Sequence, residues 1–318
     1  METKGQFKVN GTNILEEFGV FVIQYGYAGL LDAPVFKPFE TVDWMDEDGL
    51  DVDLSSPVLA ARSFSLNLGF TSLDGLNRFY EFLSGTGIVS VWMFTELGIT
   101  KNLRLSGVGT PASPSMMTGT VSITLVEDSP EAPHSPIPES PIAGVSQRGF
   151  SLDGHDFSHF GCWVLDGSIQ SLRRGPAPKT NLVIDKGEGN GQVYLPNIEG
   201  GAERTTYRSY DVTLNILINA TSVSEWKAGM DALVSLLVSA GTKKLRMGQN
   251  VIEKECFYKS LSTTRFDILP NGHVWHQMTL TVTMINARPD LIIGLLATEN
   301  GFYVETEDGK LVEILLKF

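Results

Sequence analysis

The alternation of apolar and polar residues along the chain predicts a protein built mostly of β-strands. In many segments apolar residues recur at every second position, which is the period of a strand with one buried face. In residues 72–84 and 222–238 the spacing changes to three and four residues, which places apolar side chains on one face of a helix. The pattern therefore predicts a mainly-β chain that contains two amphipathic helices.

The opening pattern of the chain occurs twice. Residues 7–22, FKVNGTNILEEFGVFV, and residues 150–164, FSLDGHDFSHFGCWV, both begin with Phe and alternate into an Asn-Gly or Asp-Gly turn. Both then contain a Phe-Gly dipeptide, after which an apolar strand pattern resumes. The two Phe residues are 11 positions apart in the first copy and 10 in the second.

The repetition continues downstream of the opening pattern. Residues 62–68 and 208–214 both read Arg-Ser-aromatic, then alternate, and lead into one of the predicted helices. Each helix is followed by a strand pattern, and each half closes on an alternating strand, at residues 121–125 and 280–284. Five features in the same order indicate a tandem duplication of one domain.

Both predicted helices carry signals at their ends. Ser72 and Ser222 are the predicted N-caps, because a serine hydroxyl accepts a hydrogen bond from a free amide of the first turn. Gly85 and Gly241 are predicted to end the helices, because glycine adopts the left-handed C′ conformation without a Cβ clash.

These patterns predict a mainly-β (α+β) fold with two tandem β-sandwich or split-barrel domains, each with one packed α-helix, and a C-terminal β-hairpin. The predicted boundaries are residues 1–127 for the first domain, 128–148 for a linker, 149–288 for the second domain and 289–318 for the hairpin tail.

The two segments outside the duplication have patterns of their own. The linker contains five prolines, which favour an extended and semi-rigid spacer. In the tail, residues 302–305 and 311–316 flank the turn Asp308-Gly309, which predicts a hairpin with an apolar edge.

The composition is that of a globular protein with an uneven charge. The chain has 318 residues, 42% of them hydrophobic, and a mean hydropathy of +0.02. No apolar run reaches the roughly 18 residues of a membrane helix, and the first residues lack the apolar core of a signal peptide. The net charge is −13, of which residues 1–145 carry −11, so the chain is expected to repel nucleic acid rather than grip it.

Most of the net negative charge of the first half lies in residues 40–53, which are predicted to form a hairpin. A glycine-rich hairpin tip at residues 186–192 stands at the corresponding place in the second half. The acidic loop contains no basic residue, and its carboxylates are Glu40, Asp43, Asp46, Glu47, Asp48, Asp51 and Asp53.

Two groups of residues could hold a metal ion. Asp46, Asp48, Asp51 and Asp53 offer hard oxygen ligands for calcium, but they lack the Gly and Glu positions of an EF-hand, so a solvated acidic loop is favoured. The second group, His155, Asp156, His159 and Cys162, lies in a strand–turn–strand pattern rather than on a helix, so a polar connection is favoured there. His273 and His276 are interpreted as surface residues.

The sequence contains none of the catalytic or nucleotide-binding motifs that we considered. The chain contains no Gly-x-Ser-x-Gly elbow and no Gly-rich loop that leads into a helix with Lys-Ser/Thr. We therefore expect no enzymatic activity, no catalytic residues, no cofactor and no bound metal. An alternative is a two-domain carbohydrate-binding or adhesion protein, in which Trp44, Trp92 or Trp163 stacks on sugars, although each stands in a strand pattern typical of a core.

The repeated motif resembles the N-terminal domain of phage distal tail proteins and the related tail-tube domain. The family's opening strand carries Phe-x-x-Asn-Gly and Phe-Gly. Its hairpin usually carries Gly-Arg-Asp-Gly, from which this chain departs with Glu47-Asp48-Gly49 and Gly189-Asn190-Gly191. The matching residues are Phe7, Asn10, Gly11, Phe18 and Gly19 in the first copy, and Phe150, Asp153, Gly154, Phe160 and Gly161 in the second.

The resemblance implies a structural component of a phage or prophage tail, such as a distal tail, baseplate hub or tube-like protein. Chains of this kind assemble into rings, either hexamers or trimers with pseudo-sixfold symmetry, alongside other tail and baseplate proteins. DNA passes through the ring without specific binding, so the acidic loop is expected to line the channel. The implied location is the virion tail, with the host cytoplasm during assembly, and no membrane is involved.

Overall fold

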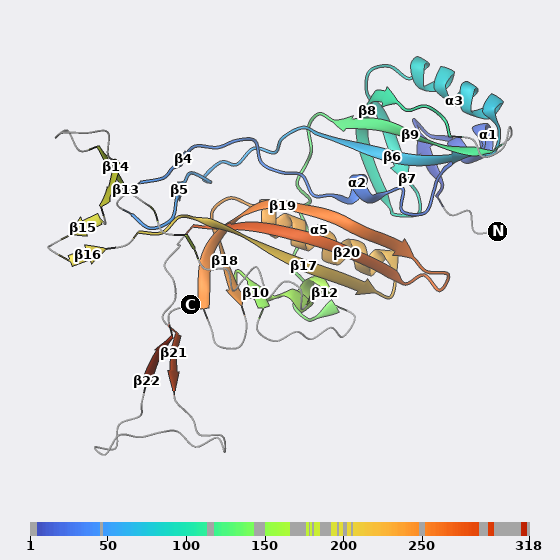
Figure 1. Ribbon diagram of the computed structural model, residues 1–318. Coiled ribbons are helices and arrows are strands. Elements are labelled where there is room, and N and C mark those ends of the chain that lie inside the picture. Colours follow the sequence, from blue (N-terminus) through green and yellow to red (C-terminus); the bar gives the residue numbers. More distant parts are fainter. Residues whose placement is uncertain are drawn as a thin grey trace.

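The computed structural model shows a mainly-β chain with curled antiparallel sheets and few helices, as the alternation predicts (Figure 1). Buried apolar residues of both halves form one contiguous core. The structure describes residues 5–44, 47–112, 118–142, 150–165, 176–177, 179, 181–184, 192–195, 197–199, 202–204, 206–247, 252–285, 292–295 and 313–316.

The first unit, residues 5–127, contains a seven-stranded antiparallel sheet in the order β2-β1-β7-β8-β9-β6-β3. Two short helices accompany the long predicted helix; they have five and four residues, too few to show a periodic apolar stripe. The strands are β1 (Phe7–Val9), β2 (Thr12–Asn13), β3 (Val20–Val22), β6 (Arg62–Phe70), β7 (Ser90–Phe94), β8 (Ile99–Val108) and β9 (Gly119–Glu127). The helices are α1 (Ile14–Phe18), α2 (Ala28–Leu31) and α3 (Leu73–Gly85).

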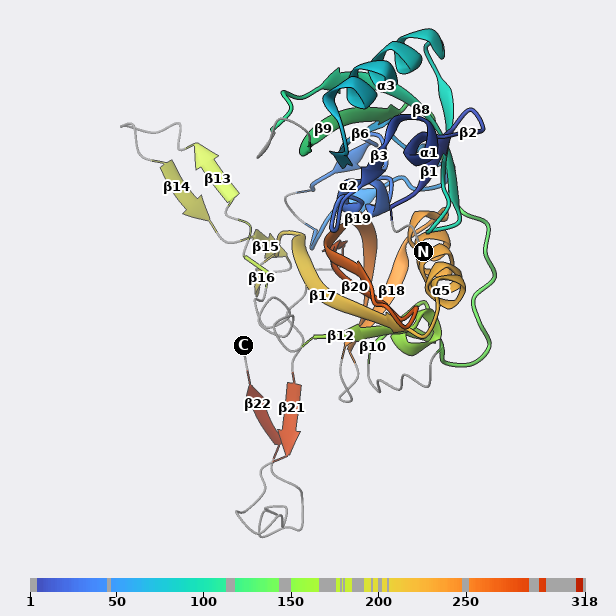
Figure 2. The same ribbon diagram turned by 90° about the vertical axis from the view of Figure 1, so that its right-hand side faces the viewer.

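The second unit, residues 150–285, repeats this arrangement with the order β11-β10-β18-β19-β20-β17-β12. The long helices α3 and α5 each lie against the sheet of their own unit (Figure 2). Strand for strand the two orders match, which is what a tandem duplication predicts. The elements are β10 (Phe150–Leu152), β11 (His155–Asp156), the 3-10 helix η2 (Phe157–Phe160), β12 (Cys162–Val164), β17 (Tyr210–Ala220), α5 (Val223–Val238), β18 (Lys243–Met247), β19 (Ile252–Ile268) and β20 (Val274–Met284).

The opening turns have the geometry that their sequence predicts. Asn10 and Gly11 have φ angles of 48° and 87°, and Asp153 and Gly154 have 48° and 79°. Two successive positive φ angles define the turn that matches the twist of a hairpin, and Asn, Asp and Gly tolerate them best.

The Phe-Gly dipeptide marks the end of a short helix in both units. Gly19 and Gly161 adopt the left-handed conformation, with φ of 69° and 70°, after the buried Phe18 and Phe160. The preceding helix has five residues in α1 and four in η2. This difference of one residue accounts for the spacings of 11 and 10 in the sequence.

Both long helices begin at the predicted caps. The Ser72 hydroxyl accepts a hydrogen bond from the Gly75 amide at 3.0 Å, and the Ser222 hydroxyl accepts one from the Glu225 amide at 3.2 Å. Each bond satisfies one of the free amides of a first helical turn.

The predicted glycine ends of the helices are wrong in position. Gly85 is the last residue of α3, and the left-handed residue is Gly87, with φ of 84°. Gly241 has φ of 83° but lies beyond the end of α5 at Val238. In both helices the first residue after the helix donates its amide to a carbonyl three residues earlier, which satisfies part of the last turn without a glycine.

A β-bulge occurs at the same place in both units. The β8–β9 register shifts between Leu105 and Gly107, and the β19–β20 register shifts between Tyr258 and Ser260. Counting from the bulge, Leu105 is equivalent to Tyr258 and Val108 is equivalent to Leu261.

The bulge also corrects the alignment of the Arg-Ser-aromatic segments. When the two units are aligned on the bulge, Glu127 of β9 is equivalent to Met284 of β20. Glu127 pairs with Arg62, and Met284 pairs with Tyr210. Arg62 is thus equivalent to Tyr210, so the alignment of Arg62 with Arg208 predicted from the sequence is wrong by two residues.

Hairpins follow β3 and β12, as predicted. In the first unit β4 (Thr41–Val42) pairs with β5 (Asp51–Val52). The tips of both predicted hairpins, residues 45–46 and 185–191, lie outside the described residues. In the second unit β13 (Asn181–Ile184) pairs with β14 (Gln192–Leu195), and β15 (Asn197–Glu199) pairs with β16 (Ala202–Arg204).

The tail forms a two-stranded antiparallel sheet, but its first strand differs from the prediction. β21 (Ile292–Leu295) pairs with β22 (Glu313–Leu316). The described partner of β22 is the apolar run at residues 292–295, and residues 302–305, which we expected to be that partner, lie outside the described residues. The predicted turn Asp308-Gly309 lies outside the described residues.

The linker packs against the second unit rather than standing away from it. The Pro138 carbonyl oxygen lies 2.6 Å from Nδ1 of His159. Ile142 covers Gly161, since a Cβ placed on that glycine would lie 3.4 Å from the Ile142 side chain. These contacts hold the described part of the linker on the surface of the second unit.

Candidate functional site: the arm between the two units

A long segment of the first unit, residues 32–61, crosses the second unit and is called the first arm. It leaves α2, runs beside β19 and carries the β4–β5 hairpin at its far end (Figure 1). The equivalent segment of the second unit, residues 166–209, is called the second arm. The first arm contains the acidic loop, so its contacts decide what that loop can do.

The base of the first arm pairs with the free edge of β19. The Ala33 amide donates to the Leu261 carbonyl at 3.0 Å, and the Thr263 amide donates to Oδ1 of Asp32 at 2.6 Å. β18 covers this edge only as far as Cys256, so the arm pairs a stretch of β19 that would otherwise be open. Unpaired strand edges bind other strands readily, and the arm removes that risk.

Aromatic rings hold the middle of the arm. Phe36 packs edge-on against Tyr258 at 5.8 Å between ring centroids, and Phe39 packs edge-on against Phe257 at 5.3 Å. Tyr258 and Phe257 are buried in the structure. Aromatic pairs of this kind contribute about 0.5–1.5 kcal/mol each beyond the burial of their area.

The tip of the arm encloses a lysine of the second unit. The Lys179 ammonium donates to the carbonyl oxygens of Trp44, Glu47 and Gly49 at 2.6, 2.7 and 3.0 Å, and lies 2.5 Å from Oδ1 of Asp43. The Lys179 side chain is only 1% exposed. The acidic loop thus forms a cage of oxygen atoms whose cation is a protein ammonium group.

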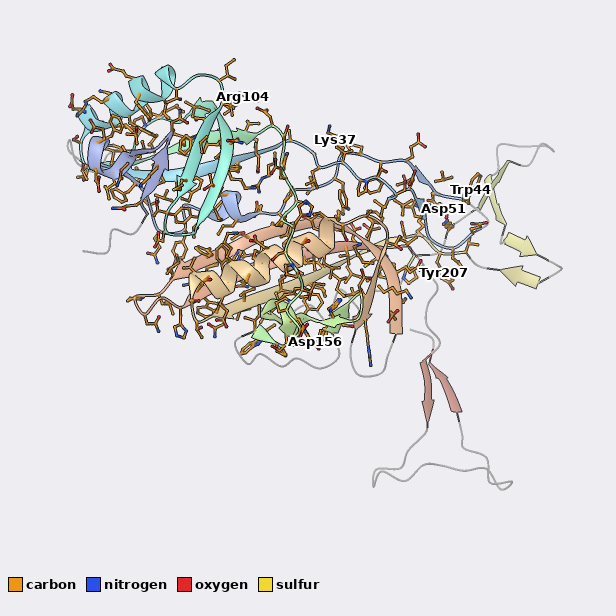
Figure 3. The ribbon with its side chains drawn as sticks, turned by 180° about the vertical axis from the view of Figure 1, so that it is seen from behind. Lys37, Trp44, Asp51, Arg104, Asp156 and Tyr207 are labelled. Carbon is orange, nitrogen blue, oxygen red and sulfur yellow. The ribbon has the colours of Figure 1, made fainter. Side chains whose placement is uncertain are left out.

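Two hydrogen bonds to the backbone of Tyr207 fix the cage to the second unit. The Tyr207 amide donates to Oδ1 of Asp48 at 2.9 Å, and the Gly49 amide donates to the Tyr207 carbonyl at 2.8 Å. Figure 3 shows Trp44, Asp51 and Tyr207 gathered at this end of the arm.

The described carboxylates that were considered as calcium ligands each accept a hydrogen bond from a different protein group. Asp48 binds the Tyr207 amide, Asp51 accepts from Nε1 of Trp44 at 2.9 Å, and Asp53 accepts from the Ser55 amide at 3.0 Å. This amide lowers the pKa of the Asp53 carboxyl. Asp46 lies outside the described residues. Among the residues that the structure describes, no three His, Cys, Asp or Glu side chains gather to hold a metal ion.

Buried charges anchor the other end of the arm. Glu127 pairs with Arg62 at 2.6 Å and with Lys101 at 2.8 Å, and Arg62 also donates to the Asp32 carbonyl. Burial acts to raise the pKa of the Glu127 carboxyl, but the two cations outweigh it and lower the pKa. Burial raises the pKa of the Asp32 carboxyl, and the bonds from Thr263 and the charge of Arg62 offset part of that rise.

The contact at Thr263 continues into the core of the second unit. The Thr263 hydroxyl lies 3.1 Å from Nε2 of His276, and Nε1 of Trp226 donates to Nδ1 of His276 at 3.0 Å. His276 has no exposed surface, so its interpretation as a surface residue is wrong. It stands on the inner face of β20, where burial lowers its pKa to about 3.

We expect His276 to make the protein less stable in mild acid. Below its ordinary value of 6.5 the unfolded histidine binds a proton, whereas the folded one stays neutral down to about pH 3. The unfolded state then binds more protons, so lowering the pH from 7 to 5 should cost about 2 kcal/mol through this group. Urea unfolding at several pH values measures the slope, which His276→Gln should flatten and His273→Gln should leave unchanged. Equal slopes in all three proteins would contradict the assignment.

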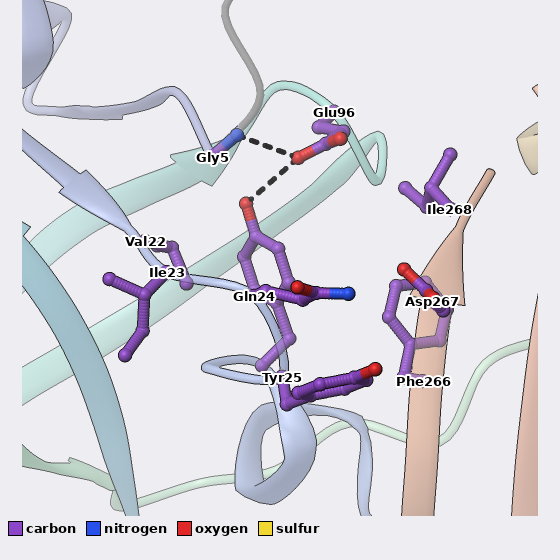
Figure 4. Close-up of a pocket in the computed structure, with 10 residues that line it drawn as sticks. Gly5, Val22, Ile23, Gln24, Tyr25, Glu96, Phe266, Asp267 and Ile268 are labelled. Atoms are coloured by element: carbon purple, nitrogen blue, oxygen red, sulfur yellow. Dashed lines mark hydrogen bonds between the residues drawn. The ribbon is translucent and has the colours of Figure 1, made fainter. Parts of the chain in front are cut away.

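A pocket of about 210 Å³ lies between the units beside the arm's origin. Glu96 accepts hydrogen bonds from the Gly5 amide at 2.8 Å and from the Tyr27 hydroxyl at 3.3 Å, and Figure 4 draws hydrogen bonds to Glu96 as dashed lines. Burial and the charge of Glu96 raise the pKa of Tyr27, so the phenol remains a neutral donor. The ten residues that line the pocket include no His, Cys, Ser or Lys, and its Glu96 carboxylate is already held by the Gly5 amide and the Tyr27 hydroxyl.

The second metal candidate is a polar connection, as favoured above. Asp156 caps η2 by accepting from the Ser158 amide at 2.9 Å, and His159 contacts the linker carbonyl of Pro138. Burial raises the pKa of the Cys162 thiol, which lies 3.7 Å from the Phe160 carbonyl. These groups serve the turn and its packing.

The three tryptophans considered for sugar binding separate into one core residue and two surface residues. Trp92 is fully buried, whereas Trp44 is 53% exposed and Trp163 is 43% exposed. The expectation that all three belong to the core is therefore wrong for Trp44 and Trp163. Trp44 is held in place by its bond to Asp51 at the tip of the arm.

No known protein-family model matches this chain, and no curated protein matches it. No helix within the described parts of the chain is long and apolar enough to cross a membrane.

The sequence predicts the acidic loop but not its partner, Lys179. Lys179 is one of several basic residues around the second hairpin, with Arg174, Lys186 and Arg204 among the others, and no local pattern links it to residues 43–49. One signal was available: three acidic residues at successive positions of a hairpin tip require a nearby cation if the tip is buried against the protein.

Proposed function

We propose that this chain is a structural subunit of a phage or prophage tail, of the distal tail, baseplate hub or tube-like kind, that forms a ring around the DNA channel. One observation carries the proposal: the chain holds two units of the same strand order, and the first docks on the second through its arm. Units that dock head to tail form closed rings when the rotation between them closes. Three chains would supply six similar units, as pseudo-sixfold symmetry requires.

In this proposal the acidic arm faces the channel. Its described carboxylates at Glu40, Asp43, Glu47, Asp51 and Asp53 belong to exposed residues. A wall of negative charge repels the phosphate backbone, so DNA slides past without a specific contact. The partners of the chain are then copies of itself and neighbouring tail and baseplate proteins, and this role needs no catalytic residue or cofactor.

Native mass spectrometry and negative-stain images of the full chain test the proposal. We expect trimers or hexamers that appear as rings with an open axial hole. The images should also place the arm tips at the hole when Thr41, an exposed residue of β4 close to the tip, is replaced by a labelled cysteine. A monomer at every concentration, or a monomer that binds glycans, would overturn the proposal. Arm tips on the outside of a ring would overturn the channel assignment alone.

A further inference from the structure

The edge of β19 that receives the first arm has an equivalent in the first unit. From the shared bulge, Val108 is equivalent to Leu261, and Thr110 to Thr263. The start of β7 is likewise equivalent to the start of β18, because Ser90 pairs with Leu103 where Lys243 pairs with Cys256. Counting back two residues makes Ile88 equivalent to Gly241.

In the second unit these positions are occupied by the first arm. Leu261 accepts from the Ala33 amide, the Thr263 amide donates to Asp32, and the Gly241 amide donates to the Leu54 carbonyl at 2.9 Å. Leu261 is 2% exposed as a result.

In the first unit the equivalent positions are open. Val108 is 44% exposed and Ile88 is 80% exposed, although both are apolar. Outside the strand ladders, no described backbone amide donates to the Val108 carbonyl, and the amides of Thr110 and Ile88 donate to no described backbone carbonyl. A free strand edge beside exposed apolar side chains is the kind of surface that pairs with another segment.

The second arm is built like the first. In the first arm the Lys37 amide donates to the Val58 carbonyl at 2.7 Å, and the Ala60 amide donates to the Val35 carbonyl at 2.8 Å. In the second arm the same pair of bonds joins Lys179 to Thr206 and Arg208 to Ala177, at 2.7 and 2.8 Å. The chain therefore has two arms with the same backbone pairing and two equivalent strand edges. Within the chain, the first arm pairs with the edge of β19.

We propose that the open edge of β8, from Val108 to Thr110, together with Ile88, is the docking site for the second arm of another copy of this chain. Within one chain the strands of the second arm, β13 and β14, lie at the far end of the molecule from β7 and β8 (Figure 1). The contact is therefore made between chains and repeats the contact made within the chain. This inference rests on the proposed ring, and it names the surface through which neighbouring chains would close that ring.

Two edge variants test the inference. Val108→Asp places a charge where Leu261 is buried in the other unit, and Thr110→Pro removes the amide equivalent to that of Thr263. We expect each to weaken association at least tenfold by analytical ultracentrifugation and to leave the circular dichroism spectrum unchanged. The matched control is Leu73→Asp, which replaces a similarly exposed apolar residue, 41% exposed, at the start of α3 and should keep the ring.

Hydrogen exchange gives a second readout that needs no variant. The Thr110 amide should exchange at least tenfold more slowly in the assembled ring than in chains diluted to monomers. Rings that tolerate both edge variants and leave this amide unprotected would overturn the inference and leave the proposed ring standing. A wild-type chain that stays monomeric at all concentrations would overturn the proposed function and the inference with it.

Discussion

Gly75→Ala and Gly229→Ala are each expected to destabilise the protein by about 3 kcal/mol or more. A Cβ at Gly75 would lie 2.1 Å from the Phe18 carbonyl oxygen, and a Cβ at Gly229 would lie 2.4 Å from the Phe160 carbonyl oxygen. Both carbonyls belong to backbone that is fixed by the following left-handed glycine, so the helix itself would have to move. Urea unfolding of each variant measures the loss.

A third helical glycine provides the control. A Cβ at Gly85, in the last turn of α3, would meet no atom within 4 Å, and its φ is not in the left-handed region. Gly85→Ala should therefore be neutral or stabilise the helix, by up to about 1 kcal/mol. Equal effects at Gly75 and Gly85 would show that the close approach of α3 to the Phe-Gly turn is not present in solution.

Lys179→Met is expected to release the tip of the first arm and to lower the free energy of unfolding by about 3 kcal/mol. The methionine keeps much of the length and apolar volume of the side chain but donates nothing to the three carbonyls and Asp43. Hydrogen exchange in residues 47–55 should accelerate, because the arm is held to the second unit there. Urea unfolding gives the accompanying loss of stability.

Lys259→Met is the matched control for Lys179. The Lys259 ammonium also lies 2.5 Å from a carboxylate, that of Asp211, but the two side chains are 54% and 41% exposed. Exposed pairs of this kind contribute about 0–1 kcal/mol, so the control should cost less than about 1 kcal/mol. If the two variants lose equal stability, burial within the arm's oxygen cage is not what makes Lys179 important.

The local elements of this fold could be predicted because their causes are local. The hydroxyls of Ser72 and Ser222 reach amides three residues away, and the Asn-Gly and Asp-Gly turns need only the positive φ that those residues tolerate. The alternation of the strands indicates which side chains face the core. The exact alignment of the two halves was harder, since the bulge that makes Arg62 equivalent to Tyr210 lies in other strands and leaves no mark in the Arg-Ser-aromatic segments.

The candidate site could be predicted only in part. The sequence identified the acidic residues as a hairpin, and β4 and β5 form one. Its ligand, Lys179, lies 130 or more positions away from the carbonyls it binds. The burial of His276 could not be predicted for a similar reason, because its partners Trp226 and Thr263 lie on α5 and β19, far from it in the sequence.

By itself, the sequence determined the mainly-β class, the order of the strands and the one long helix in each half, the N-caps of the long helices, the opening turns and the repetition of the pattern. These features depend on side-chain period and on contacts a few residues long. Only the tertiary structure decided that the first arm covers the edge of β19, that Lys179 occupies the acidic loop and that the edge of β8 stays open. Those outcomes depend on which surfaces meet when distant segments pack together, and no local pattern of residues encodes that choice.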